Sequence, residues 1–325
     1  IRRGCHAYGV ASSSYHAIRA LRDTHLSAPE WLAAIIKRDL YVDDLMSGAE
    51  TVRRARELQS KLHSHLGGHH FEIRKWASSD SRVLEGVDKS LLEHDPALDL
   101  GNEDEHTIKT LGIKWKPASD IFFFSIGHVL PDHTKRGLTK RMMLSDIAKV
   151  FDPLGWLSPA TLKLKLLMQA SWIQGLNWDA ALPDDVLEAF LEWREQLPAL
   201  REVSIPRSIL LPRNGPAEEQ FELHVFCDAS EMAYAACVYV RVVCGDAVKV
   251  TLLCAKTKVA PLKAVSIPRL ELCAAVLGSK LLTSVVESLE SLNRVPVRKF
   301  AWSDSTIVLS WLNEVPRKWN TFVQN

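Results

Sequence analysis

The strongest constraint on the fold is the alternation of apolar and polar residues in the C-terminal third of the chain. The runs predicted as strands lie at 221–228, 233–243 and 247–256. A long amphipathic helix opened by Pro268 follows over about 268–290, and then come a strand at 297–303 and a helix at 305–313. This order predicts an α+β or α/β domain built on a mixed β-sheet.

The rest of the chain is organised differently. A length of 325 residues suits two or three domains. Helical periodicity is found at 139–151, 158–175 and 184–197, and the proline-rich stretch 203–219 is typical of a linker. We therefore predict three parts, at 1–117, 118–219 and 220–325.

The first part combines helices with short strands. Residues 28–39 and 50–66 have the spacing of helices, and LYVDDLM at 40–46 lies between them as a predicted hairpin. FEIRKW at 71–76 and TLGIKW at 110–115 are predicted strands.

Charge and composition set the class of protein. The net charge is only +1, but acidic stretches at 76–107 and 171–225 separate more basic segments. This alternation fits a polyanion-binding surface, and it equally fits the solvated faces of a multidomain protein.

The six cysteines include no C-x-x-C pair, which indicates reduced thiols and an intracellular protein. No apolar run approaches the ~18 residues of a membrane span, so we expect no membrane partner.

The first candidate site is the adjacent pair Asp43 and Asp44 in the predicted hairpin. Like charges raise each other's pKa unless a cation neutralises them, and carboxylate oxygens select Mg²⁺. Phosphoryl transfer uses such clusters to hold two metal ions. Taken without context, however, Asp-Asp is also a common polar turn.

The second candidate site is Asp228, Glu271 and Asp304, which are separated by 43 and 33 residues. The predicted topology brings them together, because Asp228 ends the first strand, Glu271 lies in the first turn of the long helix and Asp304 follows the fourth strand. Each acid has an alternative interpretation when taken singly, the strongest being Asp304 as a helix N-cap.

Several motifs, in order, carry a family resemblance. Tyr41-Val42-Asp43-Asp44 is a Y-x-D-D box, and its context RDLYVDDLMSGAET resembles the polymerase of BEL/Pao-type LTR retrotransposons. The resemblance continues through TLGIKW, KRMMLSDIAKVFDPLGWLSP, LNWDAALP, HVFCDASEMAYAACVY, SIPRLEL and AWSDSTIVLSW, and it covers nearly the whole chain.

The resemblance implies a segment of a Pol polyprotein with RNA-directed DNA polymerase and ribonuclease H activities. Residues 1–117 would be the C-terminal part of a reverse-transcriptase palm, 118–219 a helical thumb- or connection-like region with a linker, and 220–325 a partial RNase H-like domain. Asp43 and Asp44 would bind Mg²⁺ in the palm, with Mn²⁺ as the alternative ion. The acids at 228, 271 and 304 would bind the same ions in the RNase H-like domain.

Five further residues are nucleic-acid-binding candidates. By the resemblance, Tyr41 would lie near the primer end, and Lys75 and Trp115 would approach the primer, unless they are ordinary strand residues. Lys140 and Arg141 lie in a basic segment at 135–170 that would follow the template–primer backbone. The alternative is that the apolar residues of this segment build a helical core while its lysines remain exposed.

The resemblance also limits what this chain does by itself. Such polymerases use a further Asp upstream of the hairpin, and RNase H domains of this type use a fourth downstream acid, so we expect both sites to be incomplete here. A catalytically inactive nucleic-acid-binding relic is therefore the alternative function. The implied partners are an RNA template, an RNA–DNA hybrid, a DNA primer, dNTPs and other Pol and Gag segments. The implied location is cytoplasmic virus-like particles with later nuclear entry.

Overall fold

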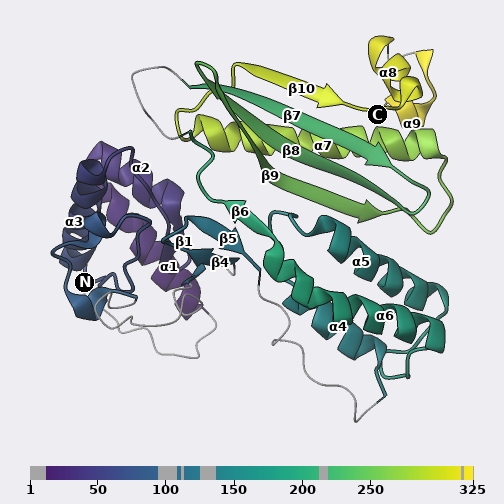
Figure 1. Cartoon of the computed structure of the whole chain (residues 1–325), viewed down its shortest axis with the longest axis horizontal. Helices are drawn as coiled ribbons and strands as arrows, with labels where there is room; N and C mark the ends of the chain where they lie inside the picture. The colour runs from purple at the N-terminus through teal and green to yellow at the C-terminus, as the bar shows by residue number, and fades with distance from the viewer. Residues whose placement is uncertain are drawn as a thin grey trace. The chain divides into compact units, whose positions relative to one another are not determined.

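The computed structural model describes residues 12–93, 108–110, 113–124, 137–211, 219–315 and 318–324. The chain divides into two compact units, which we call the N-terminal unit (Ile1–Phe122) and the C-terminal unit (Phe123–Asn325) (Figure 1). The boundaries expected at 117 and 219 stay a prediction.

The N-terminal unit is mainly helical, with short strands. Its helices and 3-10 turns are α1 (Ser13–Asp23), η1 (Thr24–Ser27), α2 (Glu30–Asp39), α3 (Val52–Gly68), η2 (Ser81–Leu84) and η3 (Lys89–Leu91). Its strands are β1 (Leu40–Tyr41), β2 (Asp44–Leu45), β3 (Ile108–Thr110), β4 (Ile113–Lys116) and β5 (Ile121–Phe123). The apolar faces of α2 and α3 supply the core of this unit, namely Leu32, Ile36, Leu58 and Leu62, together with Leu40.

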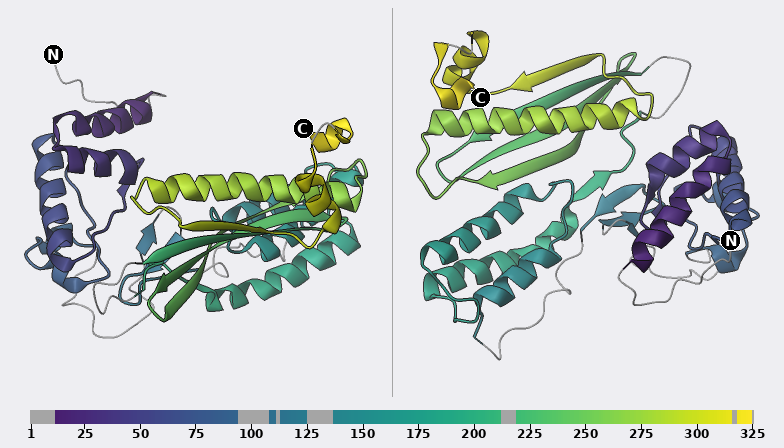
Figure 2. Two further views of the ribbon diagram at one scale, coloured as in Figure 1. Left: turned by 90° about the horizontal axis from the view of Figure 1, so that it is seen from above. Right: turned by 180° about the vertical axis from the view of Figure 1, so that it is seen from behind.

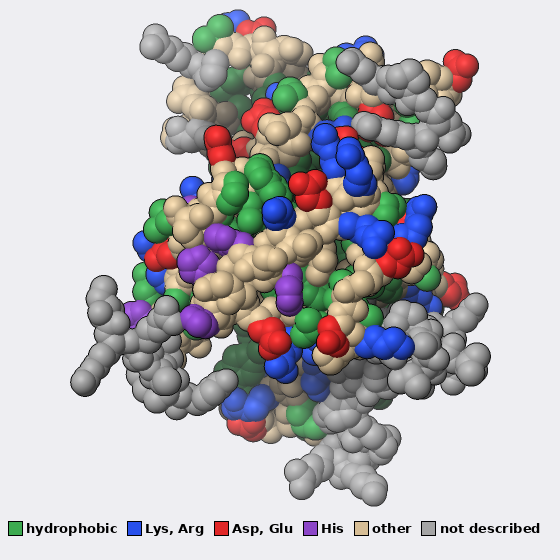
Figure 3. All heavy atoms as spheres, turned by 90° about the vertical axis from the view of Figure 1, so that its left-hand side faces the viewer, with side chains coloured by type: hydrophobic (Ala, Val, Ile, Leu, Met, Phe, Trp, Pro, Cys, Tyr) green, Lys and Arg blue, Asp and Glu red, His purple; other side chains and the backbone are tan. Residues whose placement is uncertain are grey.

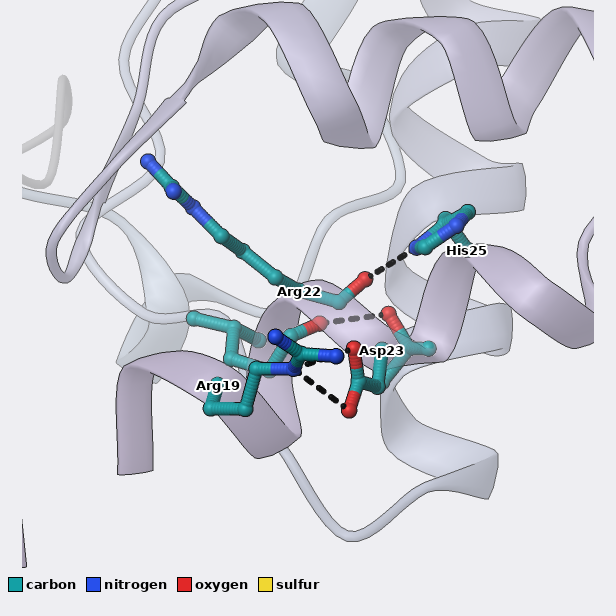
Figure 4. A network of polar contacts seen from close by, with 6 residues as sticks. Arg19, Arg22, Asp23 and His25 are labelled. Carbon is teal, nitrogen blue, oxygen red and sulfur yellow. Dashed lines mark hydrogen bonds and ion pairs between the residues drawn. The ribbon is translucent and has the colours of Figure 1, made fainter. Parts of the chain in front are cut away.

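Polar contacts fix the connections between these helices. At the end of α1, Arg19 pairs with Asp23, and a ring nitrogen of His25 donates to the Arg22 carbonyl at 2.7 Å (Figure 4). His65, on α3, donates from Nε2 to the Thr24 carbonyl at 2.9 Å. Its ring lies 4.9 Å from that of His69. Histidine side chains gather on one face of the molecule (Figure 3).

The strand expected at 71–76 is wrong. Lys75 has φ of +60°, which interrupts an extended backbone, and only Trp76 forms an isolated bridge, to Leu92. The strand expected at 110–115 is confirmed from Ile113 onward as β4, which pairs antiparallel with β3.

The C-terminal unit begins with the expected helices. These are α4 (Lys140–Lys149), α5 (Ser158–Ile173) and α6 (Asp184–Gln196), followed by η4 (Leu197–Glu202) and β6 (Ser204–Pro206). Their facing apolar residues form one core around Met143, Leu164 and Phe190. The helical core expected for this segment is therefore confirmed.

A mixed four-stranded sheet follows, as predicted. It contains β7 (Gln220–Ala229), β8 (Ala233–Cys244), β9 (Ala247–Val259) and β10 (Arg298–Trp302) in the order β10-β7-β8-β9. β10 runs parallel to β7, whereas β7, β8 and β9 are successively antiparallel. The chain ends with α8 (Thr306–Asn313) and α9 (Thr321–Gln324).

The long helix α7 (Ile267–Glu290) runs along one face of this sheet (Figure 2). Phe221, Leu223, Val225 and Cys227 point to it from β7, because every second residue of a strand lies on the same face. Gly278 allows the close approach, since a Cβ there would lie 2.3 Å from Cys227 Sγ. Among the described residues α7 is the one helix long and apolar enough to cross a membrane by length and composition, and its buried residues pack on the sheet.

The helical segment and the sheet are joined along β9. The Trp156 indole N–H donates to the carbonyls of Leu252 and Leu253 at 3.2 and 3.0 Å, and the Ala255 N–H donates to the Leu154 carbonyl at 2.8 Å. Farther along, Lys165 donates to Thr257. These bonds satisfy backbone groups that an edge strand otherwise leaves open.

Candidate functional site

The sheet and α7 bring three distant carboxylates together. Asp228 lies at the end of β7, and Asp304 follows β10, whose Trp302 is in register with Phe226. Parallel pairing therefore places residues 228 and 304 side by side. Glu271 reaches them from the start of α7, and one carboxylate oxygen from each of the three lies within 4.8 Å of the others.

Burial and charge make Glu271 the unusual member of the cluster. Only 7% of Glu271 is exposed, whereas Asp228 and Asp304 are exposed. Desolvation raises the pKa of Glu271, and the nearby charges of Asp228 and Asp304 raise it further, against a backbone hydrogen bond from Ala229 that lowers it. Within the described residues, Glu271 Oε2 is buried and has no hydrogen-bond partner.

This arrangement fits a divalent cation. Three converging carboxylates repel one another, and the unsatisfied Glu271 oxygen is a free hard donor of the kind that Mg²⁺ and Mn²⁺ prefer. Among the described residues it is the one group of three or more acidic, histidine or cysteine side chains placed to hold a metal ion.

The alternative role of Asp304 as a helix cap is wrong. The N-cap of α8 is Ser305, whose hydroxyl accepts the N–H of Val308 at 3.4 Å. The carboxylate of Asp304 is thus left for the cluster.

Asp43 and Asp44 occupy a different environment. They lie at the tip of the hairpin formed by β1 and β2, where Tyr41 pairs with Asp44, and all three side chains are exposed. Val42 has φ of +57°, a conformation that β-branched residues rarely adopt. The described residues bring no third acid, histidine or cysteine to this pair within metal-binding reach.

The predicted nucleic-acid contacts are not gathered on one element. In the N-terminal unit, Lys75 pairs with Glu93 at 3.5 Å and the Trp115 indole N–H donates to Asp120 at 3.0 Å. In the C-terminal unit, the exposed Arg141 makes a two-point ion pair with Asp179 at 2.8 and 3.0 Å. Their contacts with nucleic acid stay a prediction.

The expectation of exposed lysines in this segment is wrong for Lys140. Only 4% of this residue is exposed. Its ammonium donates to the Leu176 carbonyl at 3.2 Å and lies 5.4 and 5.0 Å from the ring centroids of Trp172 and Trp178. Contact with a phosphate would require the ammonium to leave these partners, because cation–π contacts and a carbonyl now replace its water.

Sequence reasoning missed a cavity of about 630 Å³ that borders the cluster. Asp228 and Asp304 line one side of it, and Phe226, Trp302, Tyr239 and Trp156 supply aromatic walls. The only signal in the sequence is that Phe226 and Trp302 each stand two residues before an acid of the cluster.

The solved structures that resemble this chain do so at low sequence identity. No curated protein matches the chain. Two similar solved structures are a foamy viral protease-reverse transcriptase with an RNA/DNA hybrid (13% identity, TM-score 0.47) and its dRH form with double-stranded DNA (12%, 0.44). The alignments cover 98% and 94% of this chain, but only 37% and 44% of those chains.

The sequence itself gives the decisive match. The family model described as "Pao retrotransposon-like RNaseH-like domain" matches residues 139–305, which is just over half of the chain. The matched region includes α4 to α6, the mixed sheet, α7 and all three clustered acids. The resemblance to BEL/Pao-type elements is thereby confirmed, and the chain belongs to the Pao retrotransposon-like RNaseH-like domain family.

Proposed function

We propose that the C-terminal unit cleaves the RNA strand of RNA–DNA hybrids in a metal-dependent reaction. The observation that carries this proposal is the convergence of Asp228, Glu271 and Asp304 within 4.8 Å on an RNase H-like unit. Negative charge increases at the phosphate in the transition state of phosphodiester hydrolysis, and a carboxylate cluster can support the reaction by holding divalent cations that neutralise this charge.

Each acid has a distinct part in this proposal. Asp228 and Asp304, which are exposed, would bind metal ions on the side that the phosphate approaches. The buried Glu271 would hold an ion against the sheet through its unsatisfied oxygen. Two bound Mg²⁺ ions, or Mn²⁺ in their place, would neutralise the negative charge that develops on the phosphate and would lower the pKa of the attacking water.

A polymerase function belongs to the same proposal. Asp43 and Asp44 would contribute to an RNA-directed DNA polymerase site in a reverse-transcriptase palm, with Tyr41 near the primer end and α4 to α6 acting as a thumb- or connection-like region. The strained backbone at Val42 supports this, because such strain is often found at functional sites. The partners would be an RNA template, a DNA primer, dNTPs and other Pol and Gag segments, in cytoplasmic virus-like particles and later in the nucleus.

The test is cleavage of a labelled RNA–DNA hybrid by the chain in Mg²⁺. Cleavage is expected with the wild type and with Asp43→Asn, and its loss is expected with Asp228→Asn. Cleavage that survives in Asp228→Asn would refute this site. Hybrid binding without any cleavage would instead indicate the catalytically inactive relic.

A further inference from the structure

The face of the sheet opposite α7 carries ordered rows of side chains. Pairing between β10, β7 and β8 aligns Arg298 with Glu222 and Arg241, and then Phe300 with His224 and Tyr239. The next row pairs Trp302 with Phe226, and Asp304 and Asp228 lie just beyond it. The open face therefore changes from ionic to aromatic to acidic over one strand length.

The aromatic rows form a stack of nearly parallel rings. Phe226 and Trp302 lie 6.0 Å apart with an interplanar angle of 11°, and His224 and Phe300 lie 4.8 Å apart at 15°. The Trp302 indole N–H donates to His224 Nδ1 at 3.2 Å, which fixes the orientation of the indole ring. These rings are nevertheless accessible, since Phe226 is 43% exposed and Trp302 is 49% exposed.

The cavity of about 630 Å³ joins these rings to the carboxylates. Its far wall is Trp156, which is held by its two hydrogen bonds to β9. The size is in the range of pockets that take small organic ligands, roughly 300–1,000 Å³. One ligand can therefore contact the aromatic walls and the acidic edge at once.

The chemistry of the two ends selects the ligand. Residues 226 and 228 are two positions apart on β7, a separation of about 7 Å, and Asp304 follows Trp302 by two positions just beyond the end of β10. This is the scale that separates phosphate and base within one nucleotide. At the acidic end, a phosphate would be bound through the divalent cations that Asp228 and Asp304 would hold, whereas an apolar peptide would bury these charges and offer no ligand to the cations.

We propose that this cavity binds one unpaired nucleotide of the substrate strand, with its base against Phe226 and Trp302 and its phosphate at the divalent cations that the carboxylate cluster would hold. Binding of the phosphate rests on the proposed function, because it needs the metal ions of the cleavage site. Binding of the base does not. The base end depends on stacking, which tolerates any base because every base has a flat π face.

The probe is uridine 5′-monophosphate, compared with ribose 5-phosphate, which lacks the base. Neither contains a phosphodiester, so affinity is measured in Mg²⁺ by titration without cleavage. Because every base stacks favourably on an aromatic ring, the base is expected to tighten binding by about tenfold. Trp302→Ala and Phe226→Ala are expected to remove this advantage and leave ribose 5-phosphate binding unchanged.

Two further variants sharpen the test. Trp302→Phe keeps a flat ring and should retain most of the advantage of the base. Phe151→Ala removes another half-exposed aromatic side chain, one that does not line the cavity, and should change neither affinity.

Equal binding of the two probes to the wild type would overturn the proposal, and this result does not depend on whether any variant folds. The proposal would also be overturned if both Trp302→Ala and Phe226→Ala kept the wild-type ratio of affinities for uridine 5′-monophosphate and ribose 5-phosphate. Failure of the proposed cleavage is distinguishable, because the contrast between the probes would persist while the hybrid stayed intact.

Discussion

The hairpin carboxylates and the clustered carboxylates differ in how they are brought together. Asp43 and Asp44 are neighbours in sequence, and their side chains lie exposed at the tip of a hairpin with two-residue strands. Asp228, Glu271 and Asp304 are far apart in sequence, yet they converge within 4.8 Å, with Glu271 buried. Two acids that are adjacent in sequence place negative charge at one point but leave it in water. Acids that converge through a sheet and a helix also have one carboxylate removed from water, namely that of Glu271.

The difference follows from the supporting structure. The clustered acids are carried by ten- and five-residue strands in register and by a 24-residue helix packed on them. Cooperative packing of this kind fixes side-chain positions that an isolated two-stranded hairpin does not.

Substitution of the buried acid tests the comparison with the largest expected effect. Glu271→Gln should reduce hybrid cleavage on the order of a thousandfold, because loss of a ligand removes several kcal/mol of charge stabilisation. Asp44→Asn, the matched change on the hairpin, should leave the hybrid cleavage rate unchanged. Comparable losses in both variants, measured by single-turnover kinetics, would break the comparison.

The next largest effect is on stability and concerns the turn at Gly155, which lies between α4 and α5 and packs against β9. A Cβ at Gly155 would lie 1.9 Å from the Ala255 carbonyl oxygen, and φ there is +74°. Gly155→Ala should therefore lower the free energy of unfolding by about 3 kcal/mol. Gly175→Ala, at φ of +66° in open space, is the matched control and should cost only about 1–2 kcal/mol. Equal losses in urea denaturation would show that this turn does not support the sheet.

Lys140 and Arg141 are also neighbours in sequence that lie in different environments, since Lys140 is buried and Arg141 is exposed. Lys140→Ala should cost about 2 kcal/mol of stability, because it removes a desolvated ammonium from two tryptophan faces. Arg141→Ala should cost less than about 1 kcal/mol, since exposed ion pairs contribute little. Thermal unfolding of the two variants measures the difference, and a reversed order would contradict the burial of Lys140.

The smallest effect is the pH dependence of the metal-free protein. The pKa of Glu271 is raised above its ordinary value of 4.5 in the folded state, so its ionisation as the pH rises through this region destabilises the fold. In EDTA at pH 7.5, Glu271→Gln should therefore be more stable than the wild type, by about 1 kcal/mol. This gain should vanish below pH 4, where Glu271 is protonated in both states. A gain that is constant with pH would refute the electrostatic explanation.

Mg²⁺ should reverse that order at neutral pH. A ligand that binds the folded state stabilises it, so Mg²⁺ is expected to raise the melting temperature of the wild type and not that of Glu271→Gln.

The sequence by itself determined the helices α4 to α6, the order of strands and helices from β7 to α8, the mixed sheet, and the convergence of Asp228, Glu271 and Asp304. Period-two and period-3.6 patterns report which face of each element is buried, and that information is local. The tertiary structure decided that Lys140 is buried between tryptophans, that residues 71–76 are not a strand and that Ser305, not Asp304, caps α8. It also decided that aromatic rings from β7, β8 and β10 line a cavity beside the acids. These features depend on cross-strand register and on contacts between residues far apart in sequence, which a local pattern does not contain.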